Sequence, residues 1–163
     1  MAMARSVREH LDQVGVDYDV LPHIHTDSSK QTASRAHVPA SQVAKAVLLR
    51  EDDHYLLCVI PADYRLVFSW LNAAVNGSYK LASESELAYF FDDCEVGAVP
   101  ALGQAYGCKV IWDERLADQQ DIFLESGDHE NLIHVDQYGF MTLMGEQEHL
   151  TISCPDYEAA DFC

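Results

Sequence analysis

A single lysine lies in the middle of a short apolar run, at the centre of Val43-Ala-Lys45-Ala-Val-Leu-Leu49. Alternate side chains of a strand share a face, so Lys45 would lie with Val43 and Val47 rather than with polar neighbours. Burying an unpaired ammonium is costly or lowers its pKa, so a buried lysine usually has an anion to bind. The alternative is structural, since lysines on edge strands prevent edge-to-edge pairing and their stems can lie along apolar surface.

The residues after this run predict a β-hairpin. A second apolar run, residues 55–61, follows Glu51-Asp-Asp-His54, which is typical of a turn. The hairpin places Lys45 near its open end. The chain has only four lysines, at positions 30, 45, 80 and 109. This scarcity favours an anion-binding role for Lys45 over the structural one.

Two glycine-bearing segments could complete a reactive site. In Gly97-Ala98-Val99-Pro100, glycine permits close backbone approach and proline fixes the exit of the loop, so backbone N–H groups could face a carbonyl or an oxyanion. An ordinary surface turn is the alternative. In Gly127-Asp128-His129, the histidine could orient a water or a substrate, although a loop histidine is more often solvated.

Other catalytic patterns are missing from the sequence. The eight histidines include His23, His25, His129 and His134, yet no HExxH or CxxC spacing is present, so we expect no metal site. There is no Ser-His-Asp order, Walker loop or GxGxxG fingerprint. The five cysteines are odd in number and unpaired in spacing, so we expect reduced thiols without a catalytic role.

Composition limits the classes of partner. A chain of 163 residues with 48% hydrophobic residues suits one folded domain. Its net charge of −17 disfavours non-specific binding to DNA or to membranes, so a phosphate-bearing partner must be held by local contacts. Neither a signal-peptide pattern nor a membrane-spanning stretch is present, and we expect a cytoplasmic location.

Apolar periodicity and capping residues predict an alternation of helices and strands. A first helix spans residues 4–15, and a half-buried strand covers 16–21. Asp27 or Ser28 caps a helix through Ala36, and a short turn over 39–42 precedes the lysine strand. A loop over 61–66 leads to a helix over 67–75. Later elements are a helix opened by a Ser83–Glu86 capping box, strands over 109–112, 122–125 and 132–135, and a helix over 137–144 capped by Asp136.

This pattern predicts an α+β domain with a mixed sheet, and a doubly wound parallel sheet is the alternative. We expect one domain over residues 1–145 and an acidic C-terminal tail over 146–163. The chain from Gly145 onward has five acids and no lysine or arginine, so the tail could cover a surface or extend into solvent with a frayed end.

Five separated motifs, taken together, resemble the YbaK and prolyl-tRNA synthetase-associated editing-domain family. They are the lysine strand, Pro61-Ala62-Asp63-x-Arg65, Leu81-Ala82-Ser83-Glu84, Val96-Gly97-Ala98-Val99-Pro100-x-x-Gly103 and Gly127-x-His129, and the resemblance covers about residues 9–143.

The resemblance implies a single α+β domain with a mixed, mainly antiparallel sheet flanked by helices. It implies a deacylase that acts in trans on the acceptor end of mischarged aminoacyl-tRNA, without a metal or other cofactor, with a synthetase as a possible further partner. Lys45 corresponds to the lysine required for activity, and His129 to a histidine used by some members. The loop that lines the amino-acid pocket corresponds to Gly97, Ala98, Val99 and Pro100, with Gly127 in the later turn.

The chain departs from the family in its charge and in its acidic extension. Because the net charge repels a polyanion, tRNA contacts should be few and local, and the candidates are Lys30, Arg35, Arg65 and Lys80.

The leading hypothesis is therefore an aminoacyl-tRNA deacylase, with alanine or cysteine on the tRNA for proline as the expected substrates. A non-catalytic module that binds an aminoacyl or nucleotide ligand is the main alternative, and a metal hydrolase that uses the histidines is the third.

Overall fold

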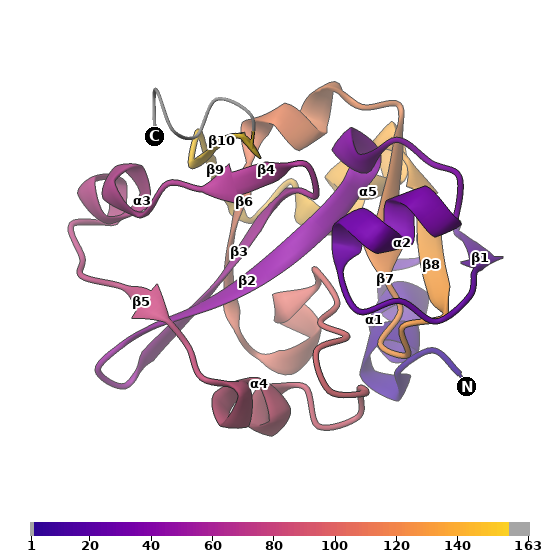
Figure 1. The fold of residues 1–163 in the computed structure, drawn as a ribbon, viewed down its shortest axis with the longest axis horizontal. Coiled ribbons are helices and arrows are strands. Elements are labelled where there is room, and N and C mark those ends of the chain that lie inside the picture. The colour runs from indigo at the N-terminus through magenta and orange to yellow at the C-terminus, as the bar shows by residue number, and fades with distance from the viewer. Residues whose placement is uncertain (1, 157–163) are drawn as a thin grey trace.

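The computed structural model describes residues 2–156 and has the predicted α+β architecture, a mixed sheet flanked by helices (Figure 1). Five α-helices occur in this part of the chain: α1 (Arg5–Val14), α2 (Ser29–Arg35), α3 (Phe68–Val75), α4 (Glu84–Phe90) and α5 (Gln137–Met144). The strands are β1 (Asp19–Pro22), β2 (Val43–Glu51), β3 (His54–Pro61), β4 (Tyr64–Leu66), β5 (Lys80–Leu81), β6 (Lys109–Asp113), β7 (Asp121–Glu125), β8 (Asn131–Asp136), β9 (Glu148–Leu150) and β10 (Ser153–Pro155). Three 3₁₀ turns join them: η1 (Ala40–Gln42), η2 (Gly103–Tyr106) and η3 (Glu114–Asp118).

The main sheet has eight strands in the order β1-β8-β7-β2-β3-β6-β9, and β5 pairs with the far end of β2. The β1–β8, β8–β7, β2–β3 and β2–β5 pairs are antiparallel, whereas β7–β2, β3–β6 and β6–β9 are parallel. The sheet is therefore mixed, which excludes the doubly wound parallel alternative.

The predicted hairpin is confirmed and forms the centre of the sheet. Strands β2 and β3 pair from Glu51↔His54 to Ala44↔Pro61, and Lys45 lies opposite Ile60 near the open end. β2 lies between β7 and β3 in the strand order, but β7 pairs with it only at Val43 and Ala44, so Lys45 is the first residue of β2 beyond that pairing.

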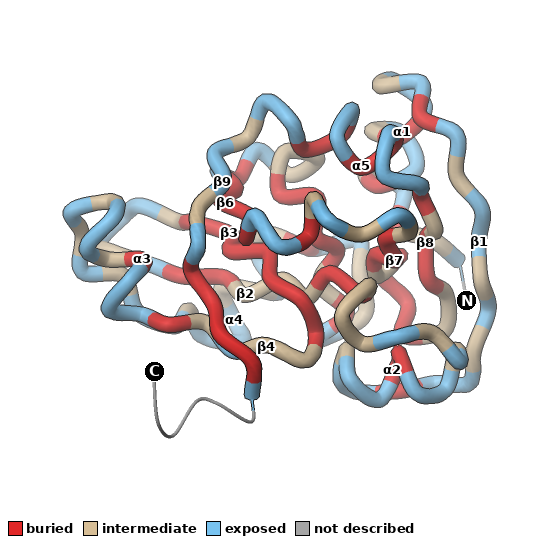
Figure 2. The backbone as a smooth tube through the Cα atoms, turned by 90° about the horizontal axis from the view of Figure 1, so that it is seen from above, coloured by how far each residue is buried: buried red, intermediate tan, exposed pale blue. Residues whose placement is uncertain are grey.

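Helices cover both faces of the sheet (Figures 1 and 2). On one face, Val7 and Leu11 of α1 and Phe140 of α5 pack with Ala44 and Leu48 of β2 in the largest apolar cluster. On the other face, Ala33 of α2 packs with Val43 at one end, and Leu71 of α3 packs with Leu49 and Ile60 at the other. Lys45 leaves β2 on this second face, as its alternation with Val43 and Val47 predicts.

Capping side chains fix the helix starts where the sequence predicts them. Ser28 accepts a hydrogen bond from the Gln31 N–H, and Ser83 and Glu86 form a reciprocal capping box. Asp136 accepts from the Gly139 N–H at the start of α5. These bonds satisfy N–H groups that the first turn of a helix leaves without partners.

Two local predictions were wrong. Strand β1 begins at Asp19 rather than at residue 16, because residues 16–18 do not reach β8, which pairs only from Asp19 onward. The predicted loop over 61–66 contains β4, and its partner is the distant β10. Of the two alternatives left open for the acidic segment, the described part has the first: β9 and β10 pair with β6 and β4 and so cover a surface. The predicted frayed end lies outside the described residues.

One buried carboxylate holds this C-terminal segment against the sheet. Asp113, fully buried at the end of β6, accepts from the Ile152 N–H at 3.0 Å, the Ser153 N–H at 2.9 Å and the Ser153 hydroxyl at 2.7 Å. Its other oxygen accepts from the Arg115 N–H at 2.9 Å.

We predict that Asp113→Ala destabilises the protein by about 3 kcal/mol or more, because several buried donors lose their acceptor at once. Urea denaturation measures the change, and Asp118→Ala, at an exposed position on η3, is the control. An Asp113→Ala variant as stable as this control would contradict the anchoring role.

None of the helices within residues 2–156 is long and apolar enough to cross a membrane.

Candidate active site

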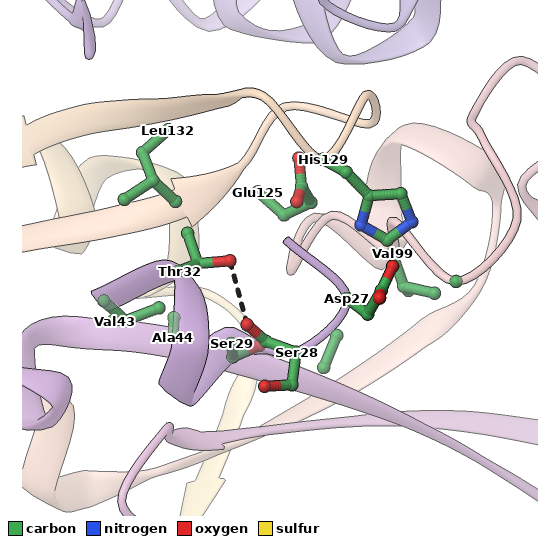
Figure 3. Close-up of a pocket in the computed structure, with 12 residues that line it drawn as sticks. Asp27, Ser28, Ser29, Thr32, Val43, Ala44, Val99, Glu125, His129 and Leu132 are labelled. Atoms are coloured by element: carbon green, nitrogen blue, oxygen red, sulfur yellow. Dashed lines mark hydrogen bonds between the residues drawn. The ribbon is translucent and has the colours of Figure 1, made fainter. Parts of the chain in front are cut away.

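A small pocket opens where β2 and β7 separate (Figure 3). The two strands pair only at Val43↔Phe123 and Ala44↔Leu124, so beyond these positions their edges diverge. The gap is closed by the start of α2, by the loop after α4 and by the β7–β8 turn. The pocket has a volume of about 50 Å³ and is lined by Asp27, Ser28, Ser29, Thr32, Val43, Ala44, Ala46, Gly97, Val99, Glu125, His129 and Leu132.

His129 lines this pocket and is buried, with 7% of its surface exposed, so the solvated alternative is wrong for this residue. Its Nε2 lies 2.6 Å from the Val96 carbonyl oxygen. A carbonyl only accepts hydrogen bonds, so Nε2 must donate, which leaves Nδ1 as an acceptor in the neutral ring. Nδ1 forms no hydrogen bond with the described part of the chain. A buried histidine with a free acceptor nitrogen at a pocket is suited to hold a water or a substrate group.

The backbone of His129 is held in an uncommon conformation by its neighbour Asp128. His129 has φ of 62°, in the left-handed region that few non-glycine residues adopt. The buried Asp128 carboxylate accepts from the Ser126 hydroxyl, from the N–H groups of Glu130 and Asn131, and from the Asn131 amide at 2.6 Å. Burial alone would raise the pKa of Asp128, but the bonds from Glu130, Asn131 and Ser126 outweigh it and lower the pKa.

The Asp128 network should make this turn sensitive to acid. Because its pKa is lower in the folded state, Asp128 stabilises the protein fully above the usual carboxyl range, and this contribution is lost as the pH falls through the folded value. We predict that Asp128→Asn reduces the unfolding free energy by about 1–3 kcal/mol at pH 7, and that the difference from wild type shrinks below about pH 4. Urea denaturation across this pH range measures it, and a difference that does not change with pH would contradict the assignment.

The two glycines have different surroundings in the structure. Gly97, with φ of 80°, lies under the ring, and a Cβ at this position would be 3.7 Å from His129 Cε1. It lines the pocket together with Val99, whereas Ala98 and Pro100 are buried and do not line it. Gly127 does not line the pocket. A Cβ there would lie 2.8 Å from the Ala4 Cβ, so the missing side chain of Gly127 allows the N-terminal segment at Ala4 to pack closely against this turn.

Lys45 is beside the pocket and does not line it. Its neighbours Ala44 and Ala46 line the pocket, as does Val43, while the Lys45 Nζ donates to the Tyr64 carbonyl oxygen at 2.9 Å. The side chain is half-buried, and this burial lowers the pKa of the ammonium, with Asp156 and Asp63 acting in the opposite direction and Lys30 in the same one.

Lys45 and Lys30 share an acidic neighbour from the C-terminal segment. The Asp156 carboxylate lies 3.5 Å from Lys30 Nζ and also acts on the charge of Lys45. Asp63 Oδ1 is buried and has no hydrogen-bond partner within residues 2–156. The anion that Lys45 was expected to need is thus supplied, at least in part, by the protein itself.

The remaining basic candidates are spread over the surface. Arg35 is exposed at the end of α2, and Arg65 is exposed on β4, opposite Cys154 of β10. Lys80 lies on β5 opposite Arg50, at the far end of β2 from the pocket. The structure therefore groups Lys30 and Lys45 and leaves Lys80 apart.

Sequence reasoning missed most of the polar groups in the pocket. Glu125 ends β7, and nothing in its local pattern marks it; its Oε2 accepts from the Gly127 N–H at 2.9 Å. Asp27 and Ser28 were identified only as possible helix caps. Both prove to line the pocket, because the start of α2 forms one of its walls.

Thiol and metal chemistry find little support in the described residues. Cys58, Cys94 and Cys108 are free, and burial raises the pKa of Cys58 and Cys94 to about 12 and that of Cys108 to about 11, so they stay protonated. Cys154 is disulfide-bonded, so the expectation of a reduced thiol was wrong for this residue. No three side chains of His, Cys, Asp or Glu within residues 2–156 are placed to hold a metal ion.

Solved structures with the same fold are described in different terms. A candidate trans-editing enzyme for prolyl-tRNA synthetase is 19% identical, with a TM-score of 0.78 over 93% of this chain and 96% of that one. A hypothetical protein is 18% identical, with a TM-score of 0.80 over 92% and 100%. A candidate signal-transduction protein from Marinobacter aquaeolei VT8 is 16% identical, with a TM-score of 0.75 over 96% of this chain and 34% of that one. At these identities the likeness establishes the fold alone.

Sequence comparison identifies the family. No protein of curated description matches the sequence. The profile of the aminoacyl-tRNA editing domain matches residues 23–143, a range that includes α2, both strands of the central hairpin, the loop with Gly97 and the turn with His129. The chain therefore belongs to the aminoacyl-tRNA editing domain family.

Proposed function

We propose that the protein is an aminoacyl-tRNA deacylase that acts in trans in the cytoplasm and hydrolyses the ester of mischarged tRNA. Alanine or cysteine attached to the tRNA for proline are the proposed substrates. The observation that carries the proposal is the small pocket in which His129 lies over Gly97 with Nδ1 free to accept a hydrogen bond. The family membership supports the same reaction class.

The pocket size suits a small aminoacyl group. At about 10–15 Å³ for each water-sized group, a volume of about 50 Å³ admits roughly four such groups. The amino group, α-carbon and side chain of an alanyl or cysteinyl ester fit within this limit, whereas a bulky side chain would clash with Val99 and Leu132. Steric exclusion of a larger side chain discriminates strongly between substrates. Discrimination against a substrate that lacks one methyl group is weaker, at only about 1–3 kcal/mol.

The proposed reaction needs few protein groups. His129 Nδ1 accepts a proton as a water oxygen attacks the ester carbonyl carbon. The bond from that carbon to the ribose oxygen then breaks, and the proton passes to the ribose oxygen, which leaves a free amino acid and a tRNA with a free hydroxyl. Backbone N–H groups of the loop with Gly97 are the candidates to stabilise the oxyanion.

Lys45 is proposed to hold the phosphate next to the terminal ribose. Its Nζ lies outside the pocket and near Lys30, so a phosphate is a better fit than the ester carbonyl. Asp156 would have to give way to the phosphate, because its carboxylate lies beside the same lysines. Arg35 and Arg65 are candidate contacts for the rest of the acceptor end.

The test is deacylation of alanyl-, cysteinyl-, seryl- and threonyl-tRNA for proline, beside correctly charged tRNAs, with and without prolyl-tRNA synthetase. Loss of one mischarged species well above its spontaneous rate would support the proposal. Spontaneous rates for every species in both conditions would refute it.

One observation favours the alternative of a non-catalytic binding module. Lys45, which the family resemblance implies is required for activity, donates to the Tyr64 carbonyl and does not line the pocket. A binding module would retain aminoacyl-tRNA in a filter-binding assay without shortening the lifetime of the ester, and this outcome separates it from the deacylase.

A further inference from the structure

The charged groups of the pocket are all acidic. Its lining includes the carboxylates of Glu125 and Asp27 and the hydroxyls of Ser28, Ser29 and Thr32, and it includes no lysine or arginine. In Figure 3, Glu125 at the end of β7 and His129 of the β7–β8 turn lie on one wall, and Asp27, Ser28 and Thr32 lie on the other, at and just before the start of α2. A cation that enters this space meets negative charge from both walls.

The side chains of the pocket also offer mainly hydrogen-bond acceptors, which suits a cationic donor. The Nε2–H of His129 is used by the Val96 carbonyl, so its ring offers an acceptor, and ionised carboxylates can only accept. Glu125 Oε2 is held by the Gly127 N–H at 2.9 Å, which fixes the carboxylate at the end of β7. Two further hydroxyls are committed in part, because Thr32 donates to the Ser28 carbonyl and Ser28 accepts from Gln31.

We infer that Glu125 binds the α-ammonium group of the aminoacyl ester and so makes a free amino group a condition for hydrolysis. This inference rests on the proposed function and deepens it. An α-amino group has a pKa of about 7.7–8.0 and is largely cationic at neutral pH. It is separated from the ester carbonyl by one carbon, so a carboxylate that holds the ammonium also fixes the carbonyl relative to His129.

The inference separates two classes of tRNA ester. Aminoacyl-tRNA carries the ammonium, whereas peptidyl-, formyl- and N-acetyl-aminoacyl-tRNA carry a neutral amide in its place. An amide cannot replace the charge, and its acyl group adds volume to a pocket of about 50 Å³. The protein should therefore leave N-blocked esters intact, so peptidyl-tRNA would be protected.

The experiment compares alanyl-tRNA with N-acetyl-alanyl-tRNA as substrates of wild type, Glu125→Gln and Glu130→Gln. Glutamine keeps an oxygen for the Gly127 N–H, so the turn should remain folded, and Glu130→Gln removes a negative charge from the same turn outside the pocket lining. We expect Glu125→Gln to lower kcat/KM for alanyl-tRNA about 10- to 100-fold, as for a hydrogen bond to a charged group. Glu130→Gln should have the same kcat/KM for alanyl-tRNA as wild type. For wild type, kcat/KM should fall by at least the same factor when alanyl-tRNA is replaced with its acetylated form.

A pH profile provides a readout that a structural role would not change. After subtraction of spontaneous hydrolysis, the preference of wild type for alanyl-tRNA over its acetylated form should decline as the pH rises through the α-amino pKa, and Glu125→Gln should show little preference at any pH. Equal wild-type hydrolysis of the two esters, or a Glu125→Gln variant equal to Glu130→Gln, would overturn the inference.

Binding of an unreactive analogue distinguishes failure of this inference from failure of the proposed function. L-Alaninamide keeps the ammonium and a carbonyl, and N-acetyl-L-alaninamide lacks the charge. If no ester is hydrolysed but NMR shows that the pocket residues bind only L-alaninamide, and bind it more weakly in Glu125→Gln, the ammonium site stands and the deacylase proposal falls. If the pocket binds neither analogue, or both equally, the ammonium site is refuted.

Discussion

Replacing Lys45 with alanine should lower kcat/KM for the mischarged tRNA by about 100-fold or more. The loss combines a missing charge-assisted contact to phosphate with poorer placement of the ester, and a shift of about 1 Å can cost about 10²-fold. The fold should persist, because burial lowers the pKa of this ammonium and the apolar replacement removes the cost of keeping it charged below that pKa. Deacylation kinetics and a thermal melt of the same samples measure the two effects.

Two variants make the Lys45 result specific. Lys45→Met keeps most of the side-chain volume and should match Lys45→Ala in activity while being at least as stable as wild type at pH 7. Lys45→Arg should recover part of the activity, because a guanidinium also binds phosphate. If all three variants deacylate at the wild-type rate, Lys45 is a structural residue that ties β2 to the Tyr64 carbonyl.

Replacing His129 with asparagine should lower kcat by about 10²–10³-fold, within the range for loss of a general base. Asparagine tolerates the left-handed conformation that residue 129 adopts, so the turn should remain close to its native shape. It cannot supply an imidazole acceptor above Gly97. Single-turnover deacylation at saturating enzyme measures the chemical step separately from tRNA binding.

Alanine at the same position separates chemistry from conformation. His129→Ala should lose as much activity as His129→Asn and should also be less stable by about 1 kcal/mol or more, because alanine is disfavoured at φ of 62°. Substantial activity in both variants would contradict the role of His129 as general base. Another group would then activate the water, and the ribose hydroxyl would be the first to test.

Much of the fold could be predicted from local physical chemistry. The Ser83–Glu86 capping box, the Asp136 cap and the hairpin around Glu51–His54 are short-range features, and each has the predicted place in the structure. The segments that were predicted wrongly depend on distant partners. β4 exists because β10 pairs with it, and β10 is held in place by Asp113.

The candidate site also combines features set by local sequence with features set by distant parts of the chain. The sequence by itself determined the family motifs, the strand that carries Lys45, and the glycines beside Val96 and His129, because these follow from residue types at fixed spacing. Only the tertiary structure decided that Lys45 lies beside the pocket rather than in it, that Asp156 lies near Lys30, and that Glu125 lines the pocket. The physical reason is that strand alternation fixes which side chains share a face, while the point where β2 and β7 separate depends on packing between segments far apart in the chain.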